Sequence, residues 1–290
     1  SGAVDVIDEI KKMPKILKFV FFIFSIGKKD KSIDTSITSG EKLCTALQSM
    51  GTTFIKLGQF LATRPDIIGD EVAKKLEKLQ DKLPAFSTSE AKEILKKEIG
   101  QKSFDNIILL GKPIAAASIA QVHFVKIKID ESEKELAIKI LRPNIHKLVN
   151  EELDALMFLA YLIETFFAKT KRLKLVEVIY LLKEITNVEM DLRFEAAAAS
   201  ELYENTKNDR FISVPKIYWP YTSKQTLTLD KIDAIPIRDL EKLKESNVDL
   251  KKLSRNLIQL FLKQAVRDGF FHGDMHQGNL FVDDKGNIIP

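Results

Sequence analysis

The chain has 290 residues, 45% of them hydrophobic, which is enough apolar side chain to bury a core and excludes an intrinsically disordered segment. Its 45 basic and 41 acidic residues leave a formal charge of +4 and are interspersed, which excludes a nucleic-acid partner recognised through a basic block. The single cysteine, Cys44, excludes an internal disulfide and favours a reducing compartment.

Residues 1–38 are expected to form a basic, apolar N-terminal segment followed by a polar linker. The most hydrophobic run, Phe19 to Phe24, is far shorter than the roughly 20 apolar residues that cross a bilayer. Lysines flank this run, which leaves two interpretations open: a helix packed on the protein, or a segment lying on an anionic membrane surface. No small-residue cleavage site follows it, so a signal peptide is not predicted.

Residues 39–105 are predicted to be a helical extension. Apolar residues recur there at steps of three or four, the period of an amphipathic helix. Helices are expected at residues 43–61, 72–83 and 90–99. The first should end before Pro65, because proline disfavours a helical residue before it, and Ser87 or Ser89 should cap the third.

Residues 106–236 are predicted to be a nucleotide-binding lobe with inserted helices. Apolar residues alternate over 119–129 and 136–141, on either side of an acidic turn, which indicates a hairpin of two strands. The pattern is helical from 150 to 203 and returns to short strands between 215 and 232.

Residues 237–290 are expected to begin a helical lobe, with a long apolar helix from 250 to 266. The next segment reads His-Gly-Asp-Met-His-Gln-Gly-Asn and places Asp274 five positions before Asn279. In phosphotransferases such an aspartate accepts or orients the proton of the attacking hydroxyl, and the asparagine holds a metal ion that neutralises phosphate charge. The spacing therefore predicts a phosphotransferase catalytic loop.

A site of this kind needs a second metal-binding aspartate after the next strand, which residues 287–289 are expected to begin. The sequence to Pro290 contains no such aspartate. We therefore expect a truncated chain that transfers phosphate poorly.

The same loop allows a second interpretation, as a metal centre. His272, Asp274 and His276 alternate, and histidine with aspartate is a ligand set for zinc or for a dinuclear hydrolytic site. Only His123 and His146 remain to complete it, and the loop asparagine would have no role. The phosphotransferase interpretation is therefore favoured.

Lys139 stands at the end of an Ala-Ile-Lys strand pattern in which the lysine holds the inner phosphates of a nucleotide. It needs a carboxylate partner on a later helix, and Glu189, Asp191 and Glu195 are the candidates. On one continuous helix Glu189 and Glu195 would project about 120° apart and form two acidic faces. An ordinary charged helix surface is the alternative.

The segment Ala115-Ala116-Ala117-Ser118 lies just before the first hairpin strand, where a phosphate-covering loop would lie. Small side chains let backbone amides approach phosphate oxygens. Alanine is less suited than glycine to positive φ, so the segment taken alone also fits a tightly packed turn.

Together these motifs resemble the UbiB family of atypical kinase-like proteins, which is associated with ubiquinone biosynthesis, from about Leu43 onward. In chain order the matching segments are Lys56-Leu57-Gly58-Gln59, Ala115 to His123, Lys139 with Arg142-Pro143, Glu189-x-Asp191, Glu195-Ala196, and Arg267 to Asn279. Gly273 stands where the family usually has alanine. Several independent motifs in one order make the resemblance specific.

The resemblance implies an α+β, atypical protein-kinase-like bilobal fold with an N-terminal helical extension and an incomplete C-terminal lobe. It implies ATP and Mg²⁺ as cofactors, and a pairing of Glu195 with Lys139. The implied catalytic residues are Asp274, Lys139 and Glu195, the nucleotide-binding residues are Ala115, Ala116, Ala117, Ser118 and Lys139, and the metal ligand is Asn279. The implied regulatory residues are Lys56, Gly58, Gln59, Glu189 and Asp191. The helix that carries the first three is expected to lie over the active site where a protein substrate would bind, with Lys56 facing the acidic pair.

The expected partners are ATP and ADP, a membrane lipid or lipid-like quinone precursor, and other quinone-biosynthesis proteins. The implied location is the cytoplasmic side of a bacterial inner membrane, with peripheral attachment because the sequence lacks the C-terminal membrane helices usual in the family. Two alternatives stay open: a small-molecule phosphotransferase of the aminoglycoside or choline kinase type, and a non-catalytic nucleotide-sensing scaffold.

Overall fold

The structure is a computed structural model, and it describes residues 39–290 except 78, 80–82, 247, 274 and 276. The predicted N-terminal segment of residues 1–38, with its hydrophobic run, lies outside the described residues. The described residues form two compact units. The first contains residues 39–83 and 146–184, and the second contains residues 84–145 and 185–290.

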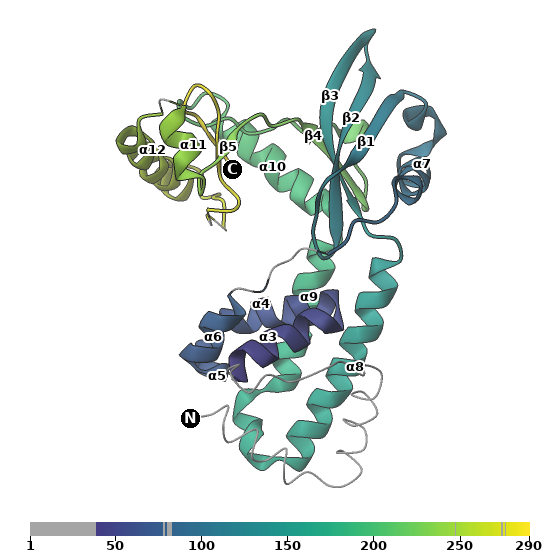
Figure 1. Ribbon diagram of the computed structural model, residues 1–290, viewed down its shortest axis with the longest axis vertical. Helices are drawn as coiled ribbons and strands as arrows, with labels where there is room; N and C mark the ends of the chain where they lie inside the picture. The colour runs from purple at the N-terminus through teal and green to yellow at the C-terminus, as the bar shows by residue number, and fades with distance from the viewer. Residues whose placement is uncertain (1–38, 78, 80–82, 247, 274, 276) are drawn as a thin grey trace. The chain divides into compact units, whose positions relative to one another are not determined.

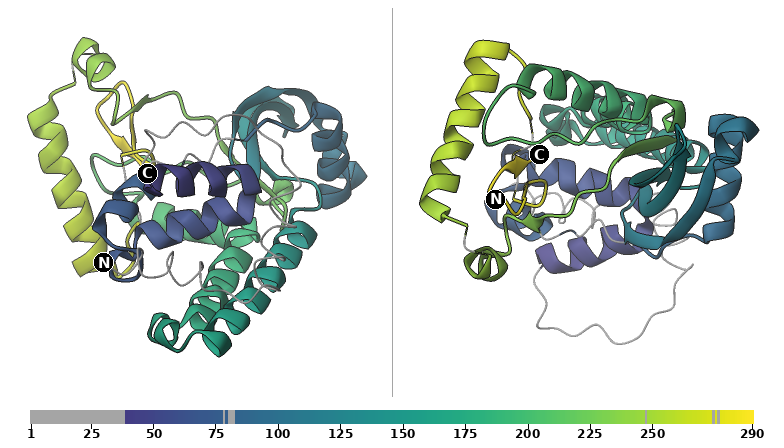
Figure 2. Two further views of the ribbon diagram at one scale, coloured as in Figure 1. Left: turned by 60° about the horizontal axis from the view of Figure 1, so that its bottom comes forward. Right: turned by 90° about the horizontal axis from the view of Figure 1, so that it is seen from above.

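The first unit is helical (Figure 1). Its elements are α3 (Ser39–Met50), α4 (Thr52–Ala62), α5 (Pro65–Ile68), α6 (Asp70–Leu76), α8 (Ile145–Phe166), the 3-10 helix η1 (Ala168–Leu173) and most of α9 (Leu175–Glu189). Helices α8 and α9 run side by side as a hairpin joined through η1 (Figure 1, Figure 2), and Lys183 of α9 contacts Asp154 of α8 at 2.8 Å. The buried side chains of Leu47, Leu76 and Leu79 form the centre of a small core with α3, α4 and α6.

The predicted single helix over 43–61 is wrong, because the chain forms two helices that meet at Gly51. The φ of Gly51 is 107°, a conformation that breaks a helix and that glycine adopts because it has no Cβ to clash. The second predicted helix is too long: α6 ends at Leu76, and Leu79 packs in the core from beyond the helix end.

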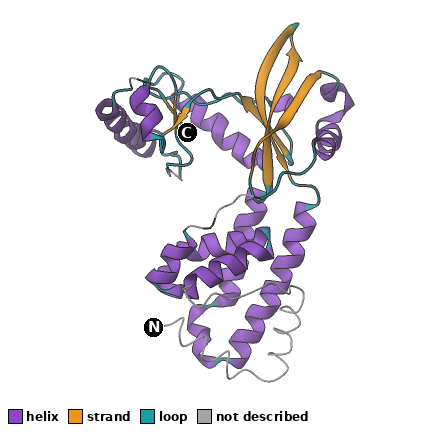
Figure 3. Cartoon of the chain, viewed as in Figure 1, coloured by secondary structure: helices purple, strands orange, loops and turns teal. Residues whose placement is uncertain are grey.

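The second unit is built on a four-stranded antiparallel sheet with the order β1-β2-β3-β4 (Figure 3). Its strands are β1 (Ile107–Ala116), β2 (Ala120–Ile129), β3 (Ser132–Leu141) and β4 (Thr226–Asp230). Helix α7 (Thr88–Phe104) covers one face, where Ala91 and Leu95 pack with Val125, Ile127 and Ile138 in a buried core. The predicted hairpin is confirmed as β2 and β3.

Helix α7 begins where the sequence places a cap. The hydroxyl of Ser87 accepts a hydrogen bond from the Glu90 backbone N–H, and the Glu90 carboxylate accepts one from the Ser87 backbone N–H. This reciprocal capping box satisfies two backbone donors that a helix start would otherwise leave unpaired. Of the two predicted caps, Ser87 is therefore the correct one.

The remaining elements of the second unit follow the sheet strand β3. They are α10 (Leu192–Thr206), the 3-10 helix η2 (Trp219–Tyr221), β5 (Ile235–Pro236), α11 (Leu240–Glu245), α12 (Leu250–Leu262), the π-helix η3 (Lys263–Asp268), β6 (Phe281–Val282) and β7 (Ile288–Ile289). Strands β5, β6 and β7 form a small antiparallel sheet. Val282 and Ile288 of that sheet pack with Leu253 and Leu260 of α12. The strand expected from residue 287 is confirmed as β7.

Strand β1 corrects the expectation that Ala115 to Ser118 form a loop. Ala115 and Ala116 are strand residues paired with Val122 and Gln121, so that only the end of the segment turns toward β2. The pairing of β1 with β2 shifts register on both sides of Pro113, and this irregularity interrupts the alternation by which a strand is recognised.

The two units group the elements differently from the predicted domains. Helix α7, predicted within the helical extension, belongs to the unit of the sheet, and α8 with most of α9, predicted as insertions in the nucleotide lobe, belong to the first unit. Among the helices of the described residues, none combines the length and the apolar character needed to cross a membrane.

Candidate active site

An ion pair joins the sheet to helix α10. The Nζ of Lys139 lies 3.0 Å from Oε1 and 2.7 Å from Oε2 of Glu195, so the predicted pairing of these residues is confirmed. Their side chains are 28% and 50% exposed. An ion pair this accessible contributes about 1 kcal/mol or less to stability. The pair therefore matters chiefly because it fixes the position of the Lys139 side chain at the surface of the sheet.

Strand alternation places Lys139 on the face of the sheet opposite α7. Its neighbours Ile138 and Ile140 are fully buried in the core formed with α7, and adjacent side chains of a strand point to opposite faces. Val122 is paired with Ala115 on one side and with Lys139 on the other. Directly paired residues share a face, so these three side chains form a row about 10 Å long across three strands.

The alanine segment reaches this surface in part. Ala115 is exposed, Ala116 and Ala117 are half-buried, and Ser118 is fully buried. Ala115 is therefore accessible on the face of the sheet that carries Lys139, whereas the Ser118 side chain is not presented to solvent.

Arg142 holds the turn that ends the alanine segment. Its guanidinium donates to the carbonyl of Ala117 from Nε at 3.1 Å and from Nη2 at 2.8 Å, and to the carbonyl of Pro84 from Nη1 at 2.9 Å. Its backbone N–H donates to the Ile119 carbonyl at 2.8 Å. The Arg-Pro motif of the sequence thus fixes the connection between β1 and β2 to the segment that enters α7.

A buried polar network lies on the other face of the same strands. The Gln121 side chain accepts a hydrogen bond from the Phe86 backbone N–H at 2.9 Å and donates one to the Phe86 carbonyl at 3.2 Å. Its Nε2 also lies 2.8 Å from His123 Nε2. His123 Nδ1 lies 2.8 Å from the Gly111 carbonyl, and burial lowers the pKa of the ring. Both ring nitrogens therefore have partners, which removes His123 from the zinc alternative. Sequence reasoning missed this network, and polar residues at inward positions of β2 were its signal.

The helix is interrupted between α9 and α10. This corrects the expectation that one helix carries Glu189, Asp191 and Glu195. Asp191 is the N-cap of α10, and its carboxylate accepts hydrogen bonds from the Arg193 backbone at 3.2 Å and from its guanidinium at 2.9 Å and 2.6 Å. These bonds hold the pKa of Asp191 below its ordinary value. Glu189 is the last residue of α9. The estimated angle between two faces of one helix therefore does not apply.

The predicted catalytic loop is described only in part. The predicted base Asp274 and the neighbouring His276 lie outside the described residues. The backbone N–H of His272 donates to Gln264 Oε1 at 3.1 Å, and the ring of Phe271 meets that of Phe261 edge to face, with centroids 5.8 Å apart. Asn279, the predicted metal ligand, is exposed just before the buried Leu280.

The predicted regulatory residues Lys56, Gly58 and Gln59 lie on α4, in the first unit, and Lys56 and Gln59 are half-buried. Gly58 is buried, and a Cβ there would lie 2.3 Å from Leu79 Cδ1 and 2.9 Å from Leu47 Cδ1. The glycine of this motif therefore permits close helix packing. The expected contact of Lys56 with the acidic pair of the second unit stays a prediction.

Comparison with known sequences gives a family. The profile of the ABC1 atypical kinase-like domain matches residues 78–290. A "Probable protein kinase UbiB" of Marinobacter nauticus is 37% identical over 255 residues, which cover 88% of this chain and 46% of that protein. The protein of the same name from Histophilus somni is 38% identical over 272 residues, covering 91% of this chain and 48% of that one. The chain thus spans about half the length of the curated relatives it matches.

Comparison with solved structures supports the fold. The complex of Rv3197 with erythromycin from Mycobacterium tuberculosis is similar with a TM-score of 0.54 and 20% sequence identity, over 98% of this chain and 65% of that one. Together with the domain profile, this similarity confirms the predicted α+β, atypical-kinase-like fold.

Proposed function

Because the chain belongs to the ABC1 atypical kinase-like family, we propose that it binds ATP with Mg²⁺ and acts as a kinase-like or ATPase-like phosphotransferase. Its resemblance to UbiB proteins supports a role in ubiquinone biosynthesis. The phosphoryl acceptor would then be water or a lipid-like quinone precursor at the cytoplasmic side of a bacterial inner membrane, where other quinone-biosynthesis proteins would be its partners.

The contact between Lys139 and Glu195 is the observation that carries this proposal. The carboxylate receives the ammonium through both of its oxygens, and an ammonium group has three donors. A lysine held this way at an accessible site can present charge to the inner phosphates of a nucleotide without being buried unpaired. Stability does not require such a pair, because its exposure limits the contribution to about 1 kcal/mol or less.

The turn after β1 supports the same site. The methyl side chain of Ala115 shares a face with Lys139 and leaves room for phosphate oxygens to approach the backbone. Two hydrogen bonds from Arg142 to the Ala117 carbonyl fix this turn. We assign the phosphates to this surface between the alanine segment and Lys139.

The catalytic loop would supply the remaining groups. Asp274 would accept the proton of the attacking hydroxyl or water, and the side-chain oxygen of Asn279 would hold Mg²⁺, a metal that prefers oxygen ligands. The described residues contain no cluster of three or more His, Cys, Asp or Glu side chains able to hold a metal. Mg²⁺ in such sites is bound largely through the nucleotide phosphates, whose charge it neutralises.

The family match favours this proposal over a small-molecule phosphotransferase of the aminoglycoside or choline kinase type. Such enzymes also have no need of the Lys56-Leu57-Gly58-Gln59 motif. A nucleotide-sensing scaffold differs from the proposed enzyme in one outcome: it binds ATP and does not turn it over.

Thermal unfolding with and without ATP and Mg²⁺ tests the nucleotide site. We expect a ligand-dependent rise in the Tm of the chain that Lys139→Ala abolishes, because the lysine is the proposed phosphate ligand. The control is Lys128→Ala, which removes an exposed lysine of β2, and it should retain the full rise. A Lys139→Ala protein that keeps the whole rise would contradict the assignment of Lys139, and a chain without any rise would contradict nucleotide binding itself.

A further inference from the structure

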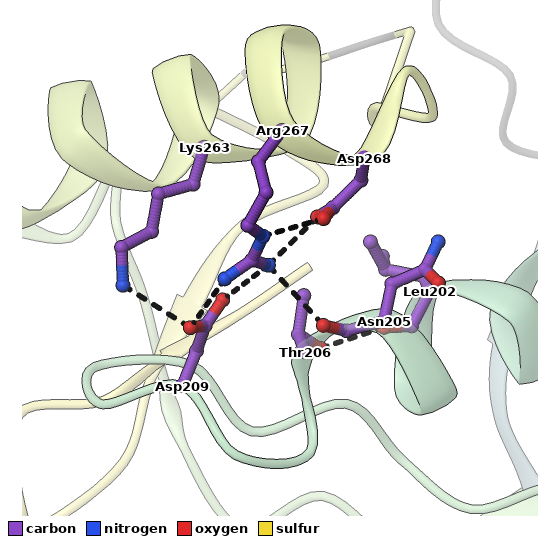
Figure 4. Close-up of polar contacts among 7 residues, drawn as sticks. All are labelled: Leu202, Asn205, Thr206, Asp209, Lys263, Arg267 and Asp268. Carbon is purple, nitrogen blue, oxygen red and sulfur yellow. Dashed lines mark hydrogen bonds and ion pairs between the residues drawn. The ribbon is translucent and has the colours of Figure 1, made fainter.

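Arg267 is the centre of a cluster of charges between helix α10 and the π-helix η3 (Figure 4). Its guanidinium contacts Asp209 from Nη1 at 2.8 Å and from Nη2 at 2.7 Å, and it also bonds the carboxylate of Asp268. Lys263, one turn earlier in η3, contacts Asp209 at 3.1 Å. Two carboxylates and two cations therefore balance each other.

The acidic side of this cluster is largely withdrawn from water. The side chains of Asp209 and Asp268 are 8% and 9% exposed, whereas that of Arg267 is 44% exposed. Hydrogen bonds from Arg267 are the main reason that the pKa of Asp209 lies below its ordinary value. A carboxylate so little exposed is costly to leave without its cation. The cluster is therefore a fixed link and differs from a mobile surface pair.

The link attaches to one end of α10. Besides its carboxylate contacts, Arg267 Nη2 donates to the backbone carbonyl of Asn205 in the last turn of the helix at 3.2 Å. Glu195, the partner of Lys139, lies in the first turn of the same helix. Asn205 follows Glu195 by ten positions along the helix, a rise of about 15 Å. Helix α10 is thus bonded to the sheet at its start and to η3 at its end.

The link continues from η3 toward the catalytic loop. Gln264, 1% exposed within η3, accepts a hydrogen bond from the backbone N–H of His272 at 3.1 Å. Gly269 ends the π-helix with a φ of 63°, the left-handed conformation that glycine adopts readily. Segments of π-helix are rare and occur frequently at functional sites. The catalytic loop therefore begins directly after the helical turn that carries Arg267.

We propose that Arg267 is a positioning residue that couples the Lys139–Glu195 pair, through α10, to the start of the catalytic loop. The coupling rests on the proposed nucleotide function, because ATP is the ligand whose binding would be transmitted. Without ATP, the charge cluster still holds residues 201–209 and 269–273 together. Occupation of the nucleotide site should accordingly rigidify residues 269–273 only while Arg267 is present.

Hydrogen exchange of the chain with and without ATP and Mg²⁺ tests this coupling. We expect nucleotide to slow the exchange of residues 269–273 by about threefold or more, and Arg267→Ala to lose that response while its nucleotide affinity stays within about threefold. Arg255→Ala is the matched control, since it removes an exposed arginine of α12, and its response should equal that of the unaltered chain. Arg267→Lys keeps the charge without the forked contacts, so its response to nucleotide should be intermediate. This variant also serves as the test if Arg267→Ala folds poorly.

An equal response to nucleotide in Arg267→Ala and the unaltered chain would overturn the proposal, as would a chain that binds nucleotide without any response at 269–273. A chain that binds no nucleotide would refute the proposed function. Hydrogen exchange of the ligand-free chain would then test whether Arg267 links the two segments. In that measurement Arg267→Ala should speed exchange in both 201–209 and 269–273, and unchanged exchange in either segment would overturn the link.

Discussion

The ammonium of Lys139 meets both carboxylate oxygens of Glu195, at 3.0 Å and 2.7 Å, across a separation of 56 residues in the chain. One residue belongs to a central strand and the other to the first turn of a helix. Because the pair is accessible and lies on the face opposite the buried core, it is suited to meet a ligand.

Replacement of Glu195 by glutamine should weaken nucleotide binding and leave stability nearly unchanged. Glutamine keeps the size of the side chain but loses the charge that orients Lys139, so we expect affinity for ATP with Mg²⁺ to fall by about three- to tenfold. The free energy of unfolding should change by about 1 kcal/mol or less. Glu201→Gln, on an exposed position of the same helix, is the control for binding titrations. Unaltered affinity in Glu195→Gln would argue against the pair as part of the site.

Gly58→Ala should destabilise the first unit. The added Cβ would lie 2.3 Å and 2.9 Å from the side chains of Leu79 and Leu47, and overpacking of this kind costs about 1–3 kcal/mol. The comparison is Gly273→Ala, because a Cβ there meets no atom within 4 Å. Denaturant unfolding should therefore separate the two variants. Equal stability would mean that the two leucines yield without cost.

Arg142→Lys should loosen the turn between β1 and β2. A lysine can replace the charge but not the fork that reaches the carbonyls of Ala117 and Pro84 together. We expect a loss of about 1–3 kcal/mol of stability, together with faster amide exchange over residues 115–120 and weaker nucleotide binding. An unchanged rate of amide exchange over residues 115–120 would show that the turn is stable without the guanidinium.

Stability should fall in acid partly through Asp209. Its pKa lies below the ordinary value of 3.8, chiefly because Arg267 bonds the carboxylate. A carboxyl with a lowered folded-state pKa contributes stability that is complete above its unfolded-state value and is lost as the pH falls through the folded-state value. Asp209→Asn should therefore cost about 1–3 kcal/mol near pH 7 and flatten the loss of stability below about pH 4.

Asp130→Asn is the matched control for Asp209→Asn. Asp130 lies in the turn between β2 and β3 with a φ of 46°, a conformation that asparagine tolerates. Urea unfolding across the acidic range should give the control the pH dependence of the unaltered chain. The same dependence in Asp209→Asn would show that the cluster around Arg267 does not contribute it.

Local signals predicted much of the fold. The alternation over 119–129 and 136–141 corresponds to β2 and β3, and Ser87, one of the two expected caps, corresponds to the start of α7. The Ala-Ile-Lys pattern placed Lys139 on a strand, and its pairing with Glu195 followed from the family resemblance. These features depend on neighbouring residues or on an established motif.

The failures have physical causes that a pattern of apolar residues does not reveal: a single backbone angle, a local cap, or contacts that are distant in sequence. The break at Gly51 leaves the apolar period of α3 and α4 continuous, so periodicity alone does not reveal it. The break at Asp191 depends on a cap formed with Arg193. Asp209 and Gln264 carried no motif, and only the folded chain brings them to Arg267 and His272.

Chemical labelling at the nucleotide site tests the central claim most directly. An acyl-phosphate derivative of ATP transfers its acyl group to the lysine that lies beside the phosphates, and mass spectrometry identifies the modified residue. The account predicts that Lys139 is the principal labelled lysine, that ATP with Mg²⁺ prevents the labelling, and that Glu195→Gln reduces it. Labelling spread over surface lysines such as Lys128, with no protection of Lys139 by ATP, would contradict it.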